Sequence, residues 1–335
     1  MPVLSQGFTS RPATLEDAEA FVDLLNTCSR ELVGMPLHDL DETITELQAP
    51  SFNTETDTRL VFASDGTLVG GVQIWDRVPH VRIYADACVH PEYRGRGIGS
   101  ALCEWIEARA QEAVPQAPEG TRVTLNQGAL TQDTPARALL EARGYRPIRY
   151  FSRMVIEMDA LPPTPLVPEG IIIRPFIRGQ EEHAMVAAEQ DAFRDHWGFV
   201  ERPLEEEVEE WMHWLETDPS VDPALWFIAV DGKEIAGMAI CFPKLAEDPE
   251  MAYVDTLGVR RPWRKRGLGL ALLQHAFGAC YERGKRKVAL DVDAESLTGA
   301  TRLYERAGMH VQRQEVAYEK ELRPGKDLST QSVAE

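Results

Sequence analysis

The sequence predicts an α+β protein that contains one domain twice, each copy a mixed, mostly antiparallel sheet flanked by helices. Three observations predict this architecture. The segment FASDGTLVGG at 62–71 recurs as IAVDGKEIAG at 228–237. The basic glycine turn at 94–99 recurs at 264–269, and LLEARGY at 139–145 recurs as LYERAGM at 303–309. Matches that keep their order through both halves of a chain indicate a duplication.

The expected elements follow the same order in each half. Thr14 and Asp17 form a capping-box pattern before the first amphipathic helix, and a second helix follows. Asp-Gly pairs at 65–66 and 231–232 predict hairpins. Apolar strands at 82–89 and 252–259 then lead through the basic turns into helices at 97–112 and 267–283. Strands at 121–126 and 286–292, short helices at 135–143 and 298–307 and closing strands complete each half.

The domain boundary is expected at a proline-rich segment. The chain has 335 residues, and ALPPTPLVPEG at 160–170 separates two strand-like stretches. Four prolines and a glycine in so short a run are typical of a stiff linker. We therefore expect an N-terminal domain over 1–160, a linker over 161–170, a C-terminal domain over 171–323 and a polar tail over 324–335.

Composition and charge exclude several classes of function. The chain carries 35 basic and 54 acidic residues, a formal net charge of −19. Such a balance argues against binding nucleic acid or anionic membranes, and it suits cationic or amine partners. No apolar run approaches the ~20 residues that a membrane span needs. The five cysteines show no CxxC spacing and the histidines no HExxH pair, so we expect no metal site and a reducing, cytoplasmic location.

The most informative segment is the basic glycine turn in the second half. Five basic residues fall between Arg260 and Arg266, and Gly267 and Gly269 open a helix. A helix start offers unpaired N–H groups to an anion, and glycine allows a phosphate to approach the backbone. The P-loop and GxGxxG patterns are both absent, which argues against a kinase or a dehydrogenase. A phosphate site is therefore predicted, with a solvated basic turn as the alternative.

This R-x-x-G-x-G turn, at Arg264–Gly269 and again at Arg94–Gly99, resembles the central motif of the GNAT superfamily of acetyl-CoA-dependent N-acetyltransferases. Leu303, Tyr304, Gly308 and Met309 match the family's helix signature. The resemblance implies two tandem GNAT folds and acetyl-CoA as cofactor. It places the cofactor on Leu257, Val259, Arg264, Lys265, Arg266, Gly267, Leu268, Gly269 and Leu270, and in the first half on Arg94, Gly95, Arg96, Gly97 and Gly99.

The resemblance also implies roles in catalysis. Tyr304 occupies the position of the family's general acid, and its first-half counterpart is Leu140, so the C-terminal domain is expected to be catalytic and the N-terminal one not. The family's usual glutamate position holds Tyr253, with Asp255 two residues on as the candidate base. Counting back from the strand end gives Ile83 and Ala85 as their counterparts. Asp291 and Asp293 are alternative bases, and the Leu257 N–H is the expected oxyanion donor.

Acceptor recognition is expected in the loop at 191–203. Phe193, Asp195, His196 and Trp197 form an aromatic and acidic set that suits an organic amine. The alternative is a hydrophobic contact that closes two helices. The resulting hypothesis is direct transfer of acetyl from acetyl-CoA to a primary amine of a small molecule or peptide, with the oligomeric state left open. A non-catalytic, CoA-responsive binding or regulatory module is the competing hypothesis.

Overall fold

The structure, a computed structural model, describes residue 4 and residues 6–332 of the chain, and it divides into two compact units. Unit 1 takes the chain up to Arg149 together with Glu315–Leu328, and unit 2 takes Tyr150–Gln314 together with the chain from Ser329. Compared with the expected domain ranges, each unit therefore includes a closing strand from the other half of the sequence. Within the described residues, no helix combines the length and apolar character that a bilayer crossing requires.

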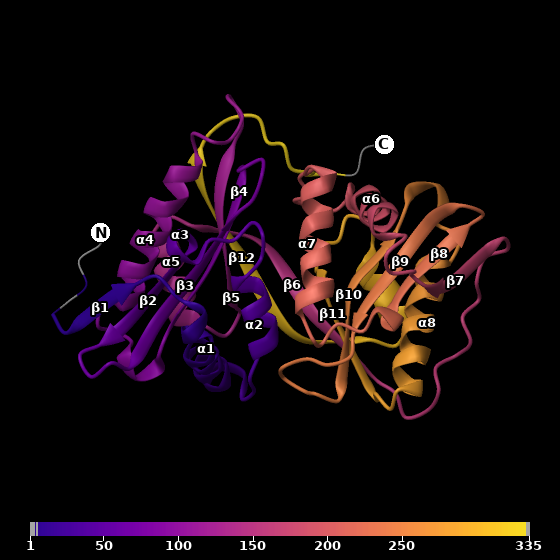
Figure 1. Ribbon diagram of the computed structural model, residues 1–335, viewed down its shortest axis with the longest axis horizontal. Helices are drawn as coiled ribbons and strands as arrows, with labels where there is room; N and C mark the ends of the chain where they lie inside the picture. Colours follow the sequence, from indigo (N-terminus) through magenta and orange to yellow (C-terminus); the bar gives the residue numbers. More distant parts are fainter. Residues whose placement is uncertain (1–3, 5, 333–335) are drawn as a thin grey trace. The chain divides into compact units, whose positions relative to one another are not determined.

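Unit 1 is a sheet with helices on both faces (Figure 1). Gly70 and Gly71 are neighbours on one strand and therefore face opposite sides of the sheet. A Cβ added to Gly71 would meet Phe21 of the first long helix, and one added to Gly70 would meet Ile98 and Leu102 of the second. The two helices thus cover opposite faces. In chain order, unit 1 consists of β1 (Phe8–Arg11), η1 (Leu15–Asp17), α1 (Ala18–Val33), α2 (Leu40–Leu47), α3 (Thr54–Asp57), β2 (Thr58–Ala63), β3 (Leu68–Asp76), β4 (Arg82–Val89), η2 (Pro91–Tyr93), α4 (Ile98–Ala113), β5 (Val123–Leu130) and α5 (Thr134–Ala142).

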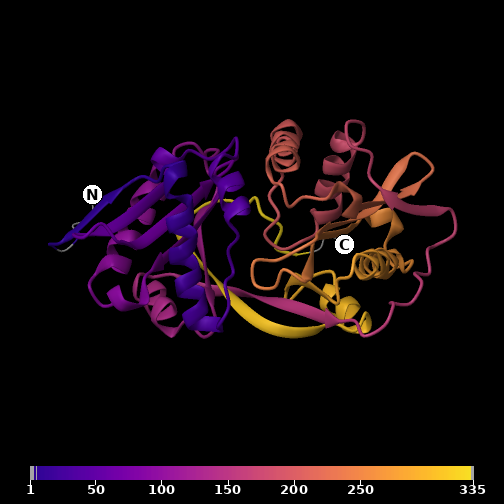
Figure 2. The same cartoon turned by 60° about the horizontal axis from the view of Figure 1, so that its bottom comes forward.

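Unit 2 repeats this arrangement. A Cβ added to Gly237 would meet Leu272 of α8, and one added to Gly258 would meet Ala192 and Phe193 at the end of α6. Helices α6 and α8 accordingly lie on opposite faces of the sheet (Figure 2). Its elements are β6 (Arg146–Glu157), β7 (Ile171–Pro175), α6 (Glu182–Phe193), α7 (Leu204–Thr217), η3 (Pro223–Leu225), β8 (Trp226–Asp231), β9 (Glu234–Phe242), β10 (Met251–Val259), η4 (Arg261–Trp263), α8 (Leu268–Glu282), β11 (Lys287–Asp293), α9 (Ala300–Arg306) and β12 (His310–Arg323).

The predicted mixed, mostly antiparallel sheets are confirmed. In unit 1 the strands follow the order β1-β2-β3-β4-β5-β12, and in unit 2 the order β6-β11-β10-β9-β8-β7. Only the pairs β4·β5 and β10·β11 are parallel among the registers that the described residues define. The closing strands exchange sheets, because β6 pairs antiparallel with β11 and the second part of β12 pairs antiparallel with β5.

The parallel pair of unit 2 separates at a β-bulge. Strands β10 and β11 are in register from Met251↔Lys287 to Tyr253↔Ala289, and both strands continue beyond this point without further pairing in the described register. On the other edge of β10, Val254 pairs with Cys241 and Thr256 with Ile240, so Asp255 is an extra residue. A bulge of this kind bends its strand. Beyond Tyr253, towards the carboxyl end of the strand, the edge of β10 that faces β11 is free of ladder pairing.

The bulge corrects the alignment of the two halves. Strand β4 pairs with β3 without a shift, and Trp75 lies opposite Tyr84 as Phe242 lies opposite Tyr253. The structural counterpart of Tyr253 is therefore Tyr84, and the expectation of Ile83 is wrong. Asp255 has no counterpart, so the assignment of Ala85 to it is wrong as well. Counting residues back from the strand end fails here because β10 contains one residue more than β4 between equivalent points.

Candidate active site

The turn before α8 takes the conformation that its glycines allow. Gly267 is the N-cap residue of α8 with φ 86°, and Lys265 has φ 60°. The turn in unit 1 has similar φ angles, 85° at Gly97 and 74° at Gly95. A β-carbon would strain such a backbone, and glycine also leaves the N–H groups at the helix start open to a ligand. Each unit thus presents unpaired N–H groups at the start of a long helix, an arrangement that suits an anion.

Three of the five basic residues in this turn bind acidic side chains of the protein, and we call these contacts the brace. Arg260 donates to Asp191 (2.7 Å), and Arg261 donates to Asp195 (2.7 Å). Arg264 contacts Asp195 as well, and it donates to the carbonyl oxygen of Val259 (2.9 Å). The side chains of Lys265 and Arg266 make no ion pair with the described residues. The positive charge available for an anion is therefore that of these two residues and of the helix start.

Asp195 is the anchor of this brace. Its side chain is only 2% exposed, and the hydrogen bonds from Arg261 and Arg264 hold the pKa of its carboxyl well below the usual range. Unit 1 has a more exposed version of the same contact, an ion pair between Arg94 and Glu31. Asp195 thus ties the end of α6 to the turn.

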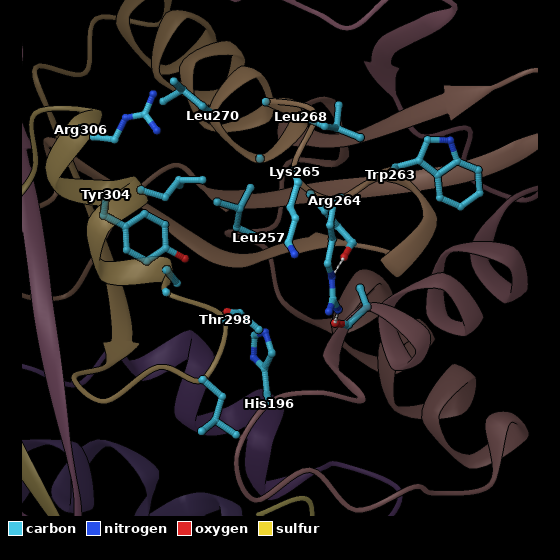
Figure 3. A pocket seen from close by; sticks show the side chains of 18 residues that line it. His196, Leu257, Trp263, Arg264, Lys265, Leu268, Leu270, Thr298, Tyr304 and Arg306 are labelled. Atoms are coloured by element: carbon cyan, nitrogen blue, oxygen red, sulfur yellow. Dashed lines mark hydrogen bonds between the residues drawn. The ribbon is translucent and has the colours of Figure 1, made fainter. Parts of the chain in front are cut away.

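A cavity of about 600 Å³ extends from this turn into unit 2 (Figure 3). The N-terminal end of α8 lines one wall of the cavity, and residues of strand β10 and helix α9 line its central part. The side chain of Tyr304 points into it from α9, and His196 points into it from the loop after α6. The lining residues are Ala192, His196, Leu257, Val259, Trp263, Arg264, Lys265, Gly267, Leu268, Gly269, Leu270, Leu297, Thr298, Gly299, Ala300, Leu303, Tyr304 and Arg306.

Most of the residues expected to bind the cofactor in the second half lie around this one cavity. From that set, Arg266 is not a lining residue. Of the expected acceptor residues, only His196 lines the cavity; Phe193 stacks on His196 with ring centroids 4.3 Å apart, and Trp197 donates to Gln331 (3.1 Å). Sequence reasoning missed Trp263, Leu303, Arg306 and the segment 297–300. Leu303 belongs to the helix signature, and Arg306 follows it by three residues, a spacing that places both on the same face of a helix.

Tyr304 contributes a buried phenol to the cavity lining. It is 7% exposed on α9, and burial raises the pKa of its hydroxyl to about 12. The phenol is therefore protonated at neutral pH. In unit 1 the same position holds Leu140, which is buried and has no proton to give.

The carboxylates considered as bases lie outside the cavity lining. Asp291 accepts hydrogen bonds from Arg153 (2.7 and 2.8 Å) and from the Tyr253 hydroxyl (3.1 Å), which commits its oxygens to this network. Asp255 accepts from Thr256 (2.9 Å), and withdrawal from bulk water raises its pKa. Asp293 accepts from the backbone N–H of Glu295 (2.9 Å).

Two anchors hold the loop that carries His196. On one side, Asp195 binds the turn before α8. On the other, the backbone N–H of Gly198 donates to the Thr330 carbonyl (2.7 Å), and the Thr330 N–H donates to the Phe199 carbonyl (2.9 Å). The segment predicted as a polar tail therefore packs against the loop in unit 2.

In both units the pairing of the two parallel strands stops before the strands end, and the first strand leads into a helix capped by glycine. This arrangement defines the fold class of the acetyltransferases. The sequence profile described as the acetyltransferase (GNAT) family matches residues 18–145 and 183–309. The chain belongs to this family, and it is an N-acetyltransferase with two tandem GNAT domains. The expected family and fold are confirmed, and the choice between an enzyme and a non-catalytic module is decided for the enzyme.

Two named acetyltransferases and one solved structure show how similar this chain is to other proteins of the family. The chain is 33% identical over 262 residues to a mycothiol acetyltransferase of Salinispora arenicola, with 74% of this chain and 76% of the relative covered. It is 30% identical over 260 residues to one of Streptomyces scabiei, with 76% and 77% covered. A crystal structure of a GCN5-related N-acetyltransferase from Sphaerobacter thermophilus is 36% identical, covers 97% of this chain and 99% of its own, and has a TM-score of 0.79.

Proposed function

We propose that this protein transfers an acetyl group from acetyl-CoA to a primary amine of a small molecule, and that unit 2 is the catalytic unit. The observation that carries the proposal is the cavity that joins the start of α8, the freed edge of β10 and the Tyr304 hydroxyl. The corresponding titratable position of unit 1 holds Leu140. Unit 1 keeps the turn, and we assign it a structural role.

The residues present fit acetyl-CoA. The N–H groups at the start of α8, with Lys265 and Arg266 nearby, suit a diphosphate. The freed edge of β10 offers backbone groups at Leu257 and Val259 to the pantetheine arm. When bound, acetyl-CoA supplies an activated acyl thioester. In this proposal the Leu257 N–H would stabilise negative charge on the acyl oxygen, and Tyr304 would protonate the departing thiolate.

The charge of the chain and the names of its relatives support this acceptor class. A net charge of −19 favours cationic acceptors near the protein, and the relatives are named for mycothiol acetylation, which concerns a small molecule. We propose direct attack by the amine. The cysteines support this, since none of the five is among the residues that line the cavity.

The test measures release of CoA thiol from acetyl-CoA with a panel of primary amines. The panel contains a polyamine, an aminoglycoside, the acetyl-accepting precursor of mycothiol and a peptide with a free N-terminus. Tyr304→Phe should lower kcat by about 100-fold or more, the usual contribution of a general acid. Tyr281→Phe on α8 is the control, since its ring packs under Arg286 and does not line the cavity. A Tyr304→Phe variant with wild-type kcat would refute the role of unit 2.

A further inference from the structure

The cavity contains a second titratable group whose role the proposed function leaves unassigned. Five of the lining side chains carry a basic or acidic group: His196, Arg264, Lys265, Tyr304 and Arg306. The arginines and the lysine are cations at neutral pH, and the tyrosine is protonated. The imidazole of His196 is the one group in this set that can accept a proton.

The surroundings of His196 keep its imidazole unprotonated at neutral pH. Burial lowers the pKa of the imidazole to about 4, and the positive charge of Arg264 acts in the same direction, whereas Asp195 opposes it. Lys265, Arg306 and the neutral phenol of Tyr304 face the same cavity. The ring rests on Phe193, and no hydrogen bond to its nitrogens is found in the described part of the chain. Figure 3 shows it pointing into the space that the Tyr304 hydroxyl also faces.

An alignment of the two units shows which residues near the cavity are found in unit 2 and not in unit 1. Asp17 and Glu181 make matching contacts with Arg11 and Arg174, and Gly34 and Gly198 both have φ 78° after the first helix. Both pairs are 164 residues apart in sequence. The same spacing aligns Asp195 with Glu31, which keeps the brace, and His196 with Leu32. In this alignment unit 1 has leucine at the positions of both His196 and Tyr304, although Leu32 lies within helix α1 and His196 in the loop after α6.

We propose that His196 is the general base of this enzyme and accepts the proton of the attacking amine across the cavity from Tyr304. This inference rests on the proposed function. An acceptor in its ammonium form first loses one proton to solvent. The neutral amine nitrogen then forms its bond to the acyl carbon, the carbon–sulfur bond breaks, a further proton passes from nitrogen to the imidazole, and the thiolate takes the proton of Tyr304. Solvent then returns a proton to Tyr304 and removes one from His196.

Two anchors fix the loop that carries His196. A general base must lie within hydrogen-bond reach of the proton that it removes, so its loop must be fixed. Asp195 fixes the loop to the turn that faces the cofactor, and Thr330 fixes it from the C-terminal segment. Unit 1 keeps the acid–arginine contact at Glu31 without a histidine, so this contact belongs to the scaffold, on which unit 2 places His196.

The experiment combines His196→Ala with chemical rescue. We expect kcat to fall by about 100-fold or more, with the calorimetric Kd for CoA within about 2-fold of wild type, and added imidazole to restore part of kcat. Imidazole should not rescue Tyr304→Phe. The control is His310→Gln, because His310 is exposed on β12 and does not line the cavity.

Three outcomes separate the alternatives. Retention of wild-type kcat by His196→Ala, or a loss that imidazole does not rescue in a variant that still binds CoA, overturns the assignment to His196. Loss of kcat in Asp255→Asn with none in His196→Ala transfers the role to that carboxylate. A wild-type protein that binds no CoA and turns over no amine overturns the proposed function itself.

Discussion

Substitution of the glycine that caps α8 tests which unit carries out the reaction. Gly267 has φ 86° and its unit 1 counterpart Gly97 has φ 85°, and a Cβ built on either residue meets no atom within 4 Å. Alanine at either site is therefore strained by its backbone alone, at a cost of about 1–2 kcal/mol. The melting temperature should fall by about 2–4 °C for each kcal/mol, and by the same amount in both variants.

The two variants should differ in activity. In Gly267→Ala the new methyl group points into the space that a diphosphate would approach, and loss of one hydrogen bond to a charged group costs about 1.5–3 kcal/mol. That corresponds to an increase of about 10- to 150-fold in KM for acetyl-CoA. Gly97→Ala should keep the wild-type KM. The assays are CoA-thiol release and thermal unfolding, and an equal rise of KM in both variants would refute the argument.

Two further predictions concern the loop that carries His196. Asp195→Asn should lower stability at pH 7 by about 2–4 kcal/mol, because it breaks a buried ion pair, whereas Glu31→Gln at the exposed counterpart should cost less than about 1 kcal/mol. The pKa of Asp195 is lowered in the folded state, so its contribution to stability is present above the unfolded pKa of about 4 and is lost as the pH falls below it. The difference in unfolding free energy between wild type and Asp195→Asn, measured by urea unfolding, should therefore shrink below about pH 4. A chain that ends at Leu328 lacks the Thr330 contacts, and its KM for the amine should rise several-fold while its Kd for CoA is unchanged; an equal loss of CoA affinity would contradict this.

The sequence predicted the parts of the fold that depend on local pattern. The helix expected at 97–112 is Ile98–Ala113, the one expected at 267–283 is Leu268–Glu282, and the strand expected at 82–89 has these bounds in the structure. Thr14 and Asp17 form the predicted capping box. Periodicity and capping act within a few residues, so they can be read without a tertiary structure.

The remaining features depend on contacts between distant residues. The closing strands β6 and β12 exchange sheets, and neither strand's own pattern of side chains specifies which edge it joins. The bulge at Asp255 is visible only from the pairing with β9. Asp195 looked like a substrate residue because its partners, Arg261 and Arg264, lie 66 and 69 residues away.

The two units together show which features belong to the fold and which to the reaction. Both keep a glycine-capped helix and an acid at the end of the first helix that pairs with the motif arginine. These contacts shape the turn, and a unit needs them whether or not it is catalytic. The bulge at Asp255, the imidazole of His196 and the phenol of Tyr304 occur in unit 2, and unit 1 has an unshifted strand and two leucines at the equivalent places. His196 and Tyr304 differ from the residues at the equivalent positions of unit 1, and both line the same cavity. The reaction is therefore most directly assigned to these two residues.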